Sequence, residues 1–184
     1  MTFETERLIL RPWTEDDAAS LYRDASDPDV GPSAGWPPHT DVENSRNVIR
    51  EILAKDGTFA VVPKGTCEAI GSISLMGNMT GSASNITDKE DEAELGYWIG
   101  KPFWGRGLIP EAARELMRYG FEELGLNKIW CGYFDGNEKS RRVQEKCGFV
   151  YHHTNRDIIW FATGETLTEH ISCITREEWN TGTD

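Results

Sequence analysis

The sequence predicts an α/β protein with one mixed sheet of about seven strands and about four helices. Two observations carry this prediction. Three strand-like runs follow one another in the middle of the chain, and the clearest amphipathic helix comes directly after an aromatic-rich strand. A regular alternation of strands and helices would instead predict a doubly wound parallel sheet. Strands are expected at residues 7–13, 58–63, 69–76, 93–100, 128–134, 149–161 and 168–174.

The N-terminal part is predicted to hold one strand and two helices. The run RLILRPW is rich in aliphatic residues and carries a proline near its end, as edge strands do. Thr14 can cap the next helix through its side-chain oxygen, and the acidic residues Glu15 to Asp17 are favourable at the positive end of that helix. A loop rich in proline and glycine leads to a second helix from about Val42, where apolar residues recur at helical spacing.

The middle of the chain is predicted as a hairpin, a loop, a strand and a long helix. TFAVVP and AIGSISLM flank a polar turn with Gly65, which is typical of an antiparallel hairpin. Residues 77–91 are expected to form a loop before the strand AELGYWIG. In the helix that follows, Pro110 falls in the first turn, where its missing amide is not needed, and Gly125 ends the apolar stripe.

The C-terminal part is predicted to complete the sheet. KIWCGYF is a strand, and Asn137 can cap a short helix over residues 138–147 that Gly148 closes. Two further strands follow, and the chain ends in a helical turn at REEW.

Composition limits the class of protein. The apolar share is that of a globular protein, and 184 residues without a repeat or long linker favour one domain. No segment has the length of a membrane span or the pattern of a secretory leader, so a cytoplasmic location is expected. The four cysteines are scattered and the four histidines lack metal spacing, so neither disulfides nor a metal is expected.

The net charge of −12 argues against nucleic acid as a partner, because nucleic-acid binding relies on clustered Lys and Arg. A cationic small substrate or a basic peptide fits this charge, and simple solubility explains it equally well.

The segment WGRGLIPEA places Gly105 and Gly107 at the start of the long helix. Free amides and the positive end of the helix dipole attract anions there, and glycine lets a phosphate approach the backbone. An ordinary tight turn with both glycines at positive φ explains the same residues. A Walker loop is excluded because no Gly-Lys-Ser/Thr follows, and the dinucleotide fingerprint fits poorly because Pro110 stands where its third glycine belongs.

Four stretches of the chain match a known pattern. They are TERLILRPWTEDDA with SDPDV, AIGSISL, AELGYWIGKPFWGRGLIPEA and GNEKSRRVQEKCGF. With them the chain resembles the GNAT superfamily of N-acetyltransferases, in its RimJ/RimL-like branch, over nearly its whole length. The resemblance implies a GNAT-like acyl-CoA N-acyltransferase fold, with residues 1–184 as a single domain. It also implies an enzyme that moves an acetyl group from acetyl-CoA to a primary amine by direct attack in a ternary complex.

The resemblance also implies a cofactor site. In that family the glycine loop binds the pyrophosphate of acetyl-CoA, the preceding strand pairs its backbone with the pantetheine arm, and the asparagine of an Asn-x-x-Ser motif contacts that arm. Together with the charge of Arg106, the matching positions here are Tyr97, Trp98, Ile99, Gly105, Arg106, Gly107, Leu108, Ile109 and Asn137.

The chemistry needs a base, a donor to the oxyanion and help for the departing thiolate. Glu94, at the start of the cofactor strand, is the candidate base, and Glu92 is a weaker neighbour on the same face. A backbone amide near Trp98 or Ile99 would hold the oxyanion. Many family members carry a tyrosine as general acid where this chain has Gln144. The resemblance nominates Ser140 of the Asn-x-x-Ser motif instead, and Ser140 could equally help to cap the helix.

Several questions stay open at this level. The acceptor is a protein N-terminal α-amine or a small amine such as a polyamine or an aminoglycoside-like compound. His39 and Trp36 are candidates for the acceptor pocket. A non-catalytic acyl-CoA sensor module is the alternative function, and Asp135, at the end of a strand, keeps a nicotinamide-dependent oxidoreductase as a third. A homodimer is left open.

Overall fold

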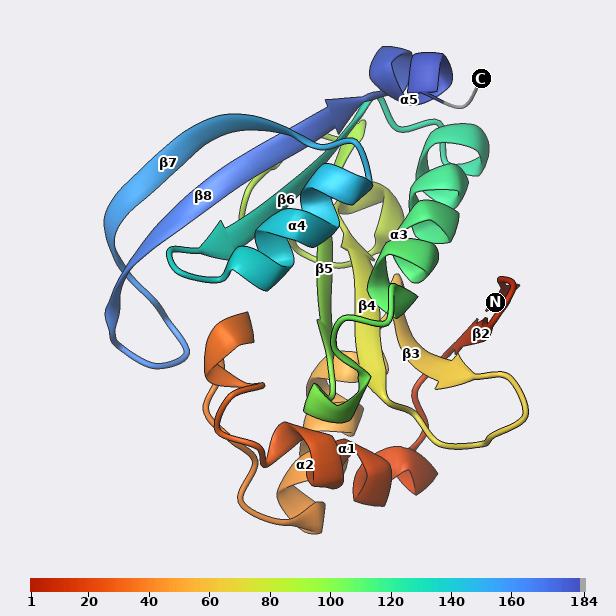
Figure 1. Cartoon of the computed structure of the whole chain (residues 1–184), viewed down its shortest axis with the longest axis vertical. Helices are drawn as coiled ribbons and strands as arrows, with labels where there is room; N and C mark the ends of the chain where they lie inside the picture. The colour runs from red at the N-terminus through yellow and green to blue at the C-terminus, as the bar shows by residue number, and fades with distance from the viewer. Residues whose placement is uncertain (183–184) are drawn as a thin grey trace.

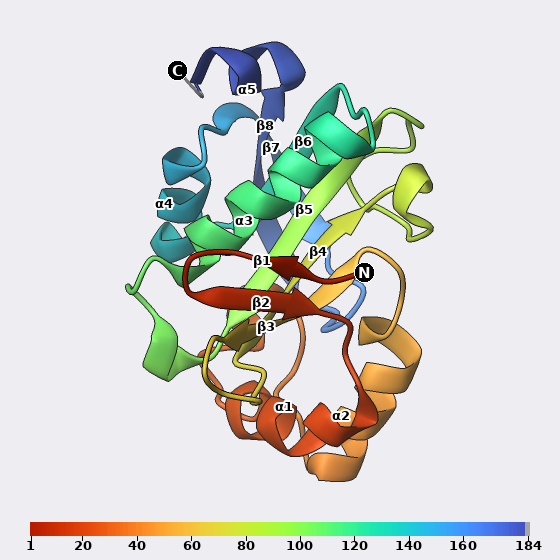
Figure 2. The ribbon, with the colours of Figure 1, turned by 90° about the vertical axis from the view of Figure 1, so that its right-hand side faces the viewer.

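The computed structural model describes residues 1–182 of the chain and contains one mixed sheet. Within these residues the sheet has eight strands, in the order β1-β2-β3-β4-β5-β6-β8-β7 (Figures 1 and 2). The strands are β1 (Phe3–Glu4), β2 (Leu8–Arg11), β3 (Thr58–Pro63), β4 (Gly71–Met76), β5 (Glu92–Ile99), β6 (Lys128–Phe134), β7 (Val150–Ile159) and β8 (Thr166–Thr175).

Five α-helices surround this sheet in the described part of the chain. They are α1 (Ala18–Ala25), α2 (Val42–Val48), α3 (Leu108–Arg118), α4 (Glu138–Lys146) and α5 (Arg176–Gly182). In Figure 1, α3 and α4 lie in front of the sheet, α1 and α2 lie below it, and α5 lies at the top. No helix within residues 1–182 is both long and apolar enough to cross a membrane.

At β5 the strand pairing changes from antiparallel to parallel. Strands β1 to β5 pair with their neighbours in antiparallel fashion, whereas β5 and β6 run parallel because α3 connects them. This parallel ladder is short. Its last pair joins Glu94 to Trp130, although β5 continues to Ile99 and β6 to Phe134. Past Glu94 the two strands lose their pairing and diverge (Figure 1), and we call the region between their unpaired backbones the wedge.

Two apolar cores hold the helices on the sheet. The first is formed by the sheet residues that face α3, including Ile73, Leu95 and Ile129, together with Leu116 and Met117 of α3. The second lies under α1 and α2. It contains Trp13, Ala18, Leu21, Ala25, Ile49, Ala60, Val62 and Ala69. Since strand side chains alternate between faces, odd-numbered residues of β5 contact the first core, and Trp98 packs against the second.

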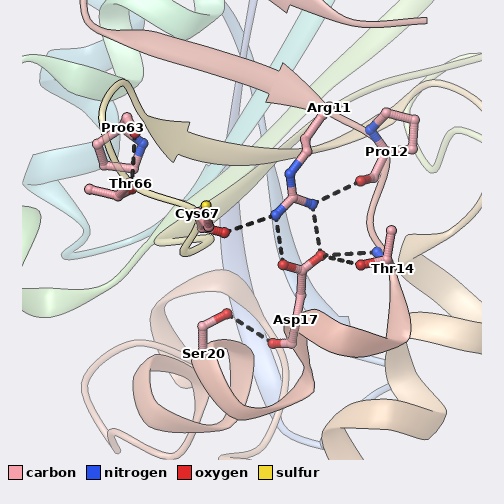
Figure 3. Close-up of polar contacts among 8 residues, drawn as sticks. All are labelled: Arg11, Pro12, Thr14, Asp17, Ser20, Pro63, Thr66 and Cys67. Atoms are coloured by element: carbon pink, nitrogen blue, oxygen red, sulfur yellow. Dashed lines mark hydrogen bonds and ion pairs between the residues drawn. The ribbon is translucent and has the colours of Figure 1, made fainter.

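A buried ion pair fastens α1 to β2 (Figure 3). Asp17 is 6% exposed, and its two carboxylate oxygens accept hydrogen bonds from Arg11 Nη1 at 2.8 Å and Nη2 at 2.7 Å. The backbone N–H and the hydroxyl of Thr14 also donate to this carboxylate. Arg11 Nη2 reaches further, to the carbonyl oxygen of Cys67. The entry to α1 is therefore tied to β2 and to the loop after β3.

The expected elements are present, with local differences. Strands 58–63 and 128–134 have the predicted bounds. The two-residue β1 adds an eighth strand, because Phe3 packs on Phe59 and Tyr119. The terminal helix is longer than the predicted single turn. The 77–91 segment contains a 3-10 turn at Asn78–Thr80.

Candidate functional site

The unpaired part of β5 presents backbone groups to the wedge. Gly100 N–H donates to Ile70 O on the β4 side at 2.8 Å. Because backbone groups alternate along an antiparallel pair, Trp98 also turns its amide toward β4, whereas Tyr97 and Ile99 turn theirs toward the wedge. Of the two amides considered for the oxyanion, that of Ile99 faces the wedge. Trp104 Nε1 donates to the carbonyl oxygen of Ile99 at 2.8 Å.

The loop before α3 lies next to the wedge, because Trp104 contacts the wedge-facing carbonyl of Ile99 and Lys139 at the start of α4 lies over the Trp104 ring. Gly105 and Gly107 have φ of 74° and 73°, in the left-handed region that favours glycine. A Cβ at Gly105 would meet no atom of residues 1–182 within 4 Å, so its outer side is open there. Leu108 is the first residue of α3, and the side chain of Ile109, which follows it, is 4% exposed. The guanidinium of Arg106 lies over the Phe103 ring, 5.5 Å from its centroid.

Arg7, which the sequence reasoning did not single out, orients this loop. Its Nη1 donates to Arg106 O at 3.1 Å and its Nη2 to Gly107 O at 3.2 Å. Since a trans peptide holds its C=O and N–H on opposite sides, the amides of Gly107 and Leu108 point away from Arg7. Glu111 in turn holds Arg7 through a 2.6 Å ion pair. The helix start therefore presents amides outward, which is the arrangement that binds anions.

The start of α4 reaches into the wedge from the other side. Asn137 caps the helix, because its Oδ1 accepts from Ser140 N at 3.1 Å. Its Nδ2 donates to Ser33 O, so it also anchors the loop before α2. The Ser140 hydroxyl lies 2.9 Å from the Tyr97 hydroxyl. Burial raises the pKa of Tyr97 well above its usual value, so this phenol stays protonated.

Gln144 fills the position where the family's tyrosine is expected. It is 2% exposed, and its Nε2 donates to Gly132 O at 3.1 Å. That carbonyl belongs to the stretch of β6 that has lost its pairing with β5, so the glutamine side chain replaces the missing strand partner. Gln144 Oε1 is buried and accepts no hydrogen bond within the described residues. Such an orphaned acceptor is the kind of group that a bound molecule satisfies.

Glu94 lies on the opposite face of β5. Its Oε2 accepts from Ser84 Oγ at 2.9 Å and from Asn85 N at 2.8 Å. Burial raises the pKa of this carboxyl group above the ordinary glutamate value, although these hydrogen bonds act in the other direction. A raised pKa brings a carboxylate closer to the range useful for a general base. Glu92, two residues earlier, is bound instead by Lys89, Thr87 and Trp130.

A second carboxylate that the sequence did not reveal lies near Glu94. Glu169 of β8 covers Gly132, since a Cβ at that glycine would lie 2.5 Å from Glu169 Oε1. Burial, followed by the charge of Glu94, raises the pKa of Glu169. The only sequence signal for this approach was the glycine itself, because a glycine inside a strand often marks a close contact.

Aromatic side chains lie on the same face, closer to α1 and α2. Trp36 packs edge-on to Trp98 with ring centroids 5.6 Å apart, and His39 lies 5.3 Å from Trp36. Burial lowers the pKa of His39, so it stays neutral at neutral pH. Trp98 and Glu94 are four residues apart on one strand face, which corresponds to about 13 Å.

The predicted residues are therefore brought together in two groups. Tyr97, Ile99, the glycine loop, Asn137 and Ser140 surround the wedge. Glu94 and the side chain of Trp98 occupy the other face of β5. Within residues 1–182 no three His, Cys, Asp or Glu side chains are arranged to hold a metal ion.

Comparisons with known proteins agree on one family. Residues 7–150 match the family model described as "Acetyltransferase (GNAT) domain". The "Uncharacterized N-acetyltransferase p20" of Bacillus licheniformis is 37% identical over 134 residues, which are 70% of this chain and 70% of that protein. The "Putative ribosomal N-acetyltransferase YdaF" of Bacillus subtilis (strain 168) is 46% identical over 76 residues, 41% of this chain and 42% of that protein.

The fold agrees as well. A solved GNAT-family acetyltransferase from Bacillus anthracis superposes with a TM-score of 0.82 at 24% identity, covering 96% of this chain and 99% of that one.

Proposed function

Since the chain belongs to the GNAT acetyltransferase family and is an N-acetyltransferase of the RimJ/RimL-like branch, we propose that it transfers the acetyl group of acetyl-CoA to a primary amine. The observation that carries this proposal is the wedge, with outward-facing amides of a helix start on one side of β5 and the partly buried carboxylate of Glu94 on the other. Membership of an enzyme family sets aside the sensor module and the oxidoreductase.

Four features of the wedge fit acetyl-CoA. The outward amides of Gly107 and Leu108 suit the pyrophosphate, with Arg106 and Ile109 beside them, and the open side of Gly105 allows a close approach. The backbone N–H and C=O groups of Tyr97 face the wedge, where they can form hydrogen bonds with the amides of the pantetheine arm. Gln144 Oε1 supplies a buried acceptor that has no hydrogen-bond partner among residues 1–182. When bound there, acetyl-CoA supplies an activated acyl carbon whose leaving group is a thiolate.

Three groups of this chain would serve the transfer. Glu94 accepts a proton from the attacking amine through water, because the Ile99 amide lies five residues further along β5. The Ile99 amide faces the wedge and can donate to the oxyanion that forms during attack. Ser140 donates a hydrogen bond to the thiolate, and the neutral phenol of Tyr97 supports it by donating to the serine oxygen. This arrangement gives the chain a donor pair where the family's tyrosine is missing.

The acceptor that fits best is a protein N-terminal α-amine. An α-amine has a pKa of about 7.7 to 8.0 and is partly neutral near pH 7, whereas a lysine amine near 10.4 is mostly protonated. One relative is named a ribosomal N-acetyltransferase, and two similar structures carry ribosomal-protein acetyltransferase titles. The net charge of −12 favours a basic acceptor of this kind. A small amine is the second candidate, and the cytoplasmic location and the homodimer stay predictions.

The cofactor site is tested by thermal unfolding. Acetyl-CoA at a hundredfold excess over its dissociation constant adds about 2.7 kcal/mol, which raises the midpoint by about 5 to 10 °C for a chain of this length. In Gly105→Ala the added methyl group occupies the open side of the loop, so we expect the rise to shrink strongly.

Gly65→Ala is the matched control. Gly65 has φ of 83°, and a Cβ there would also meet no atom within 4 Å in the described part of the chain, but the residue lies in the turn after β3. Both variants carry the same backbone strain, so their own midpoints should fall alike, and only Gly105→Ala should lose the response to acetyl-CoA. Equal responses in the two variants, or no response in the wild type, would refute the proposed site.

The acceptor is tested by thiol release from acetyl-CoA with four amines. These are a peptide with a free N-terminal serine, the same peptide with a blocked N-terminus and a free lysine, spermidine, and an aminoglycoside. We expect the first peptide to give the highest kcat/KM. A higher value with spermidine or the aminoglycoside would assign the enzyme to small amines instead.

A further inference from the structure

The hydrogen-bond partners of Ser84 determine where its hydroxyl proton points. Its oxygen accepts hydrogen bonds from the backbone amides of Ile86 at 3.0 Å and Thr87 at 3.1 Å. A serine hydroxyl has one proton and two lone pairs, so these two amides use its acceptor capacity. Its single proton is then directed to Glu94 Oε2, 2.9 Å away.

A second donor in the same turn reinforces this contact. Asn85 N–H donates to the same oxygen, Glu94 Oε2, at 2.8 Å. Both hydrogen bonds therefore hold one carboxylate oxygen against the loop that follows β4. In Figure 2 this loop, coloured yellow-green, lies on the side of the sheet away from α3 and α4. Glu94 Oε1 takes no part in either contact.

We propose that Ser84 is a positioning residue for the acetyl transfer, which holds Oε2 of Glu94 on the loop and so leaves Oε1 to receive the proton of the acceptor amine. The proposal rests on the proposed role of Glu94 as the base. Ser84 acts through Glu94 by orienting its carboxylate. Because two donors hold one carboxylate oxygen, the group cannot rotate about its terminal bond, and this orientation is set before the amine binds.

Other titratable groups lie around Glu94, and its charge raises the pKa of two of them, Glu169 and Cys131. Glu169 of β8 and Cys131 of β6 both interact electrostatically with Glu94, and Glu92 lies on the same face of β5 with Lys89 as its ion-pair partner. Burial raises the pKa of Glu94, and hydrogen bonds from the Asn85 amide, the Ser84 hydroxyl and the Ile86 amide oppose this rise. Removing the serine hydroxyl should therefore raise the pKa of Glu94 further.

The same loop offers a matched control. Thr87 Oγ1 donates to Glu92 Oε2 at 3.0 Å, so Thr87→Val breaks a loop-to-carboxylate hydrogen bond of similar length. The valine keeps its backbone amide, and thus the hydrogen bond from residue 87 to Ser84 Oγ. Any effect of Ser84→Ala that arises only from loosening the loop should appear in Thr87→Val as well.

The experiment combines two pH titrations of wild type, Ser84→Ala, Ser84→Thr and Thr87→Val. The first follows kcat/KM with the most active amine of the panel. The second follows the carboxyl carbon of Glu94 by NMR in protein labelled with carbon-13 at glutamate Cδ, with Glu94→Gln identifying the signal. In Ser84→Ala we expect kcat/KM near pH 7 to fall about tenfold, the loss of one hydrogen bond to a charged group. We also expect the acid limb and the NMR midpoint to move to higher pH.

Ser84→Thr keeps the hydroxyl and should restore both titrations toward wild type, while Thr87→Val should leave them unchanged. Wild-type titrations in Ser84→Ala, or equal shifts in Thr87→Val, would overturn the proposal. Full activity in Glu94→Gln would instead overturn the proposed role of Glu94. The NMR midpoint does not depend on turnover, so it separates these two failures.

Discussion

Replacing Glu94 by glutamine should lower kcat at least a hundredfold and leave the KM for acetyl-CoA unchanged. General base catalysis contributes about 10² to 10⁴ in rate, and glutamine cannot accept the proton of the amine. The amide oxygen of glutamine can still accept the hydrogen bonds from Ser84 and Asn85, so the loop stays in place. The acetyl-CoA contacts proposed here lie on the wedge side of β5, away from this substitution. Steady-state kinetics with the best acceptor of the panel measures both constants.

The pH dependence of kcat/KM tests more directly whether Glu94 is the base. Because burial raises the pKa of Glu94, the acid limb of kcat/KM in the wild type should lie above the usual glutamate range near 4.3, and the rate should fall as pH drops through it. Glu94→Gln should lack this limb. Glu92→Gln is the control on the same strand face, and it should retain the limb. A hundredfold loss in Glu92→Gln with a normal Glu94→Gln would move the base to Glu92.

Arg11→Met should destabilise the fold by about 3 to 5 kcal/mol, and so lower the thermal midpoint by roughly 10 °C. The substitution leaves the carboxylate of Asp17, which is 6% exposed, without its bidentate partner. Removal of one partner from a buried pair is costly because the remaining charge stays away from water. Urea unfolding monitored by tryptophan fluorescence measures the change.

Arg50→Met supplies the contrast on the same helix entry. Arg50 and Glu15 form an ion pair at 2.9 Å in which both side chains are about half exposed, so water screens the pair and its loss should change stability little. A loss in Arg50→Met as large as that in Arg11→Met would mean that the buried pair is not the cause.

The stability gap between wild type and Arg11→Met should depend on pH in a defined direction. Burial alone would raise the pKa of Asp17, but hydrogen bonds from Arg11 and Thr14 together lower it below the ordinary value. A carboxyl group whose folded-state pKa is lowered stabilises the fold fully above its unfolded pKa of about 3.9. That contribution is lost as pH falls through the folded value. The gap should thus be constant near neutrality and close in acid.

Local features of this fold were predictable where they depend on neighbouring residues. The hairpin around Gly65, the helix start after Gly107 and the cap at Asn137 follow from turn chemistry and periodicity within about ten residues, and all three are present. The strands at 58–63 and 128–134 were predicted with the observed bounds for the same reason. The two-residue β1 was not, because it forms only through pairing with β2 and packing on Phe59.

The candidate site likewise has residues that the sequence predicted and contacts that only the tertiary structure creates. The sequence by itself determined the family, the glycine loop, the candidate base Glu94 and the Asn-x-x-Ser motif, because each is a short run of residues. Only the tertiary structure decided which groups meet. Tyr97 contacts Ser140 across 43 positions, Arg7 holds a carbonyl 99 positions away, and Glu169 covers Gly132 from β8. These contacts depend on strand register and on the divergence of β5 from β6, which no local pattern specifies, because pairing between distant strands is chosen by the packing of the whole sheet.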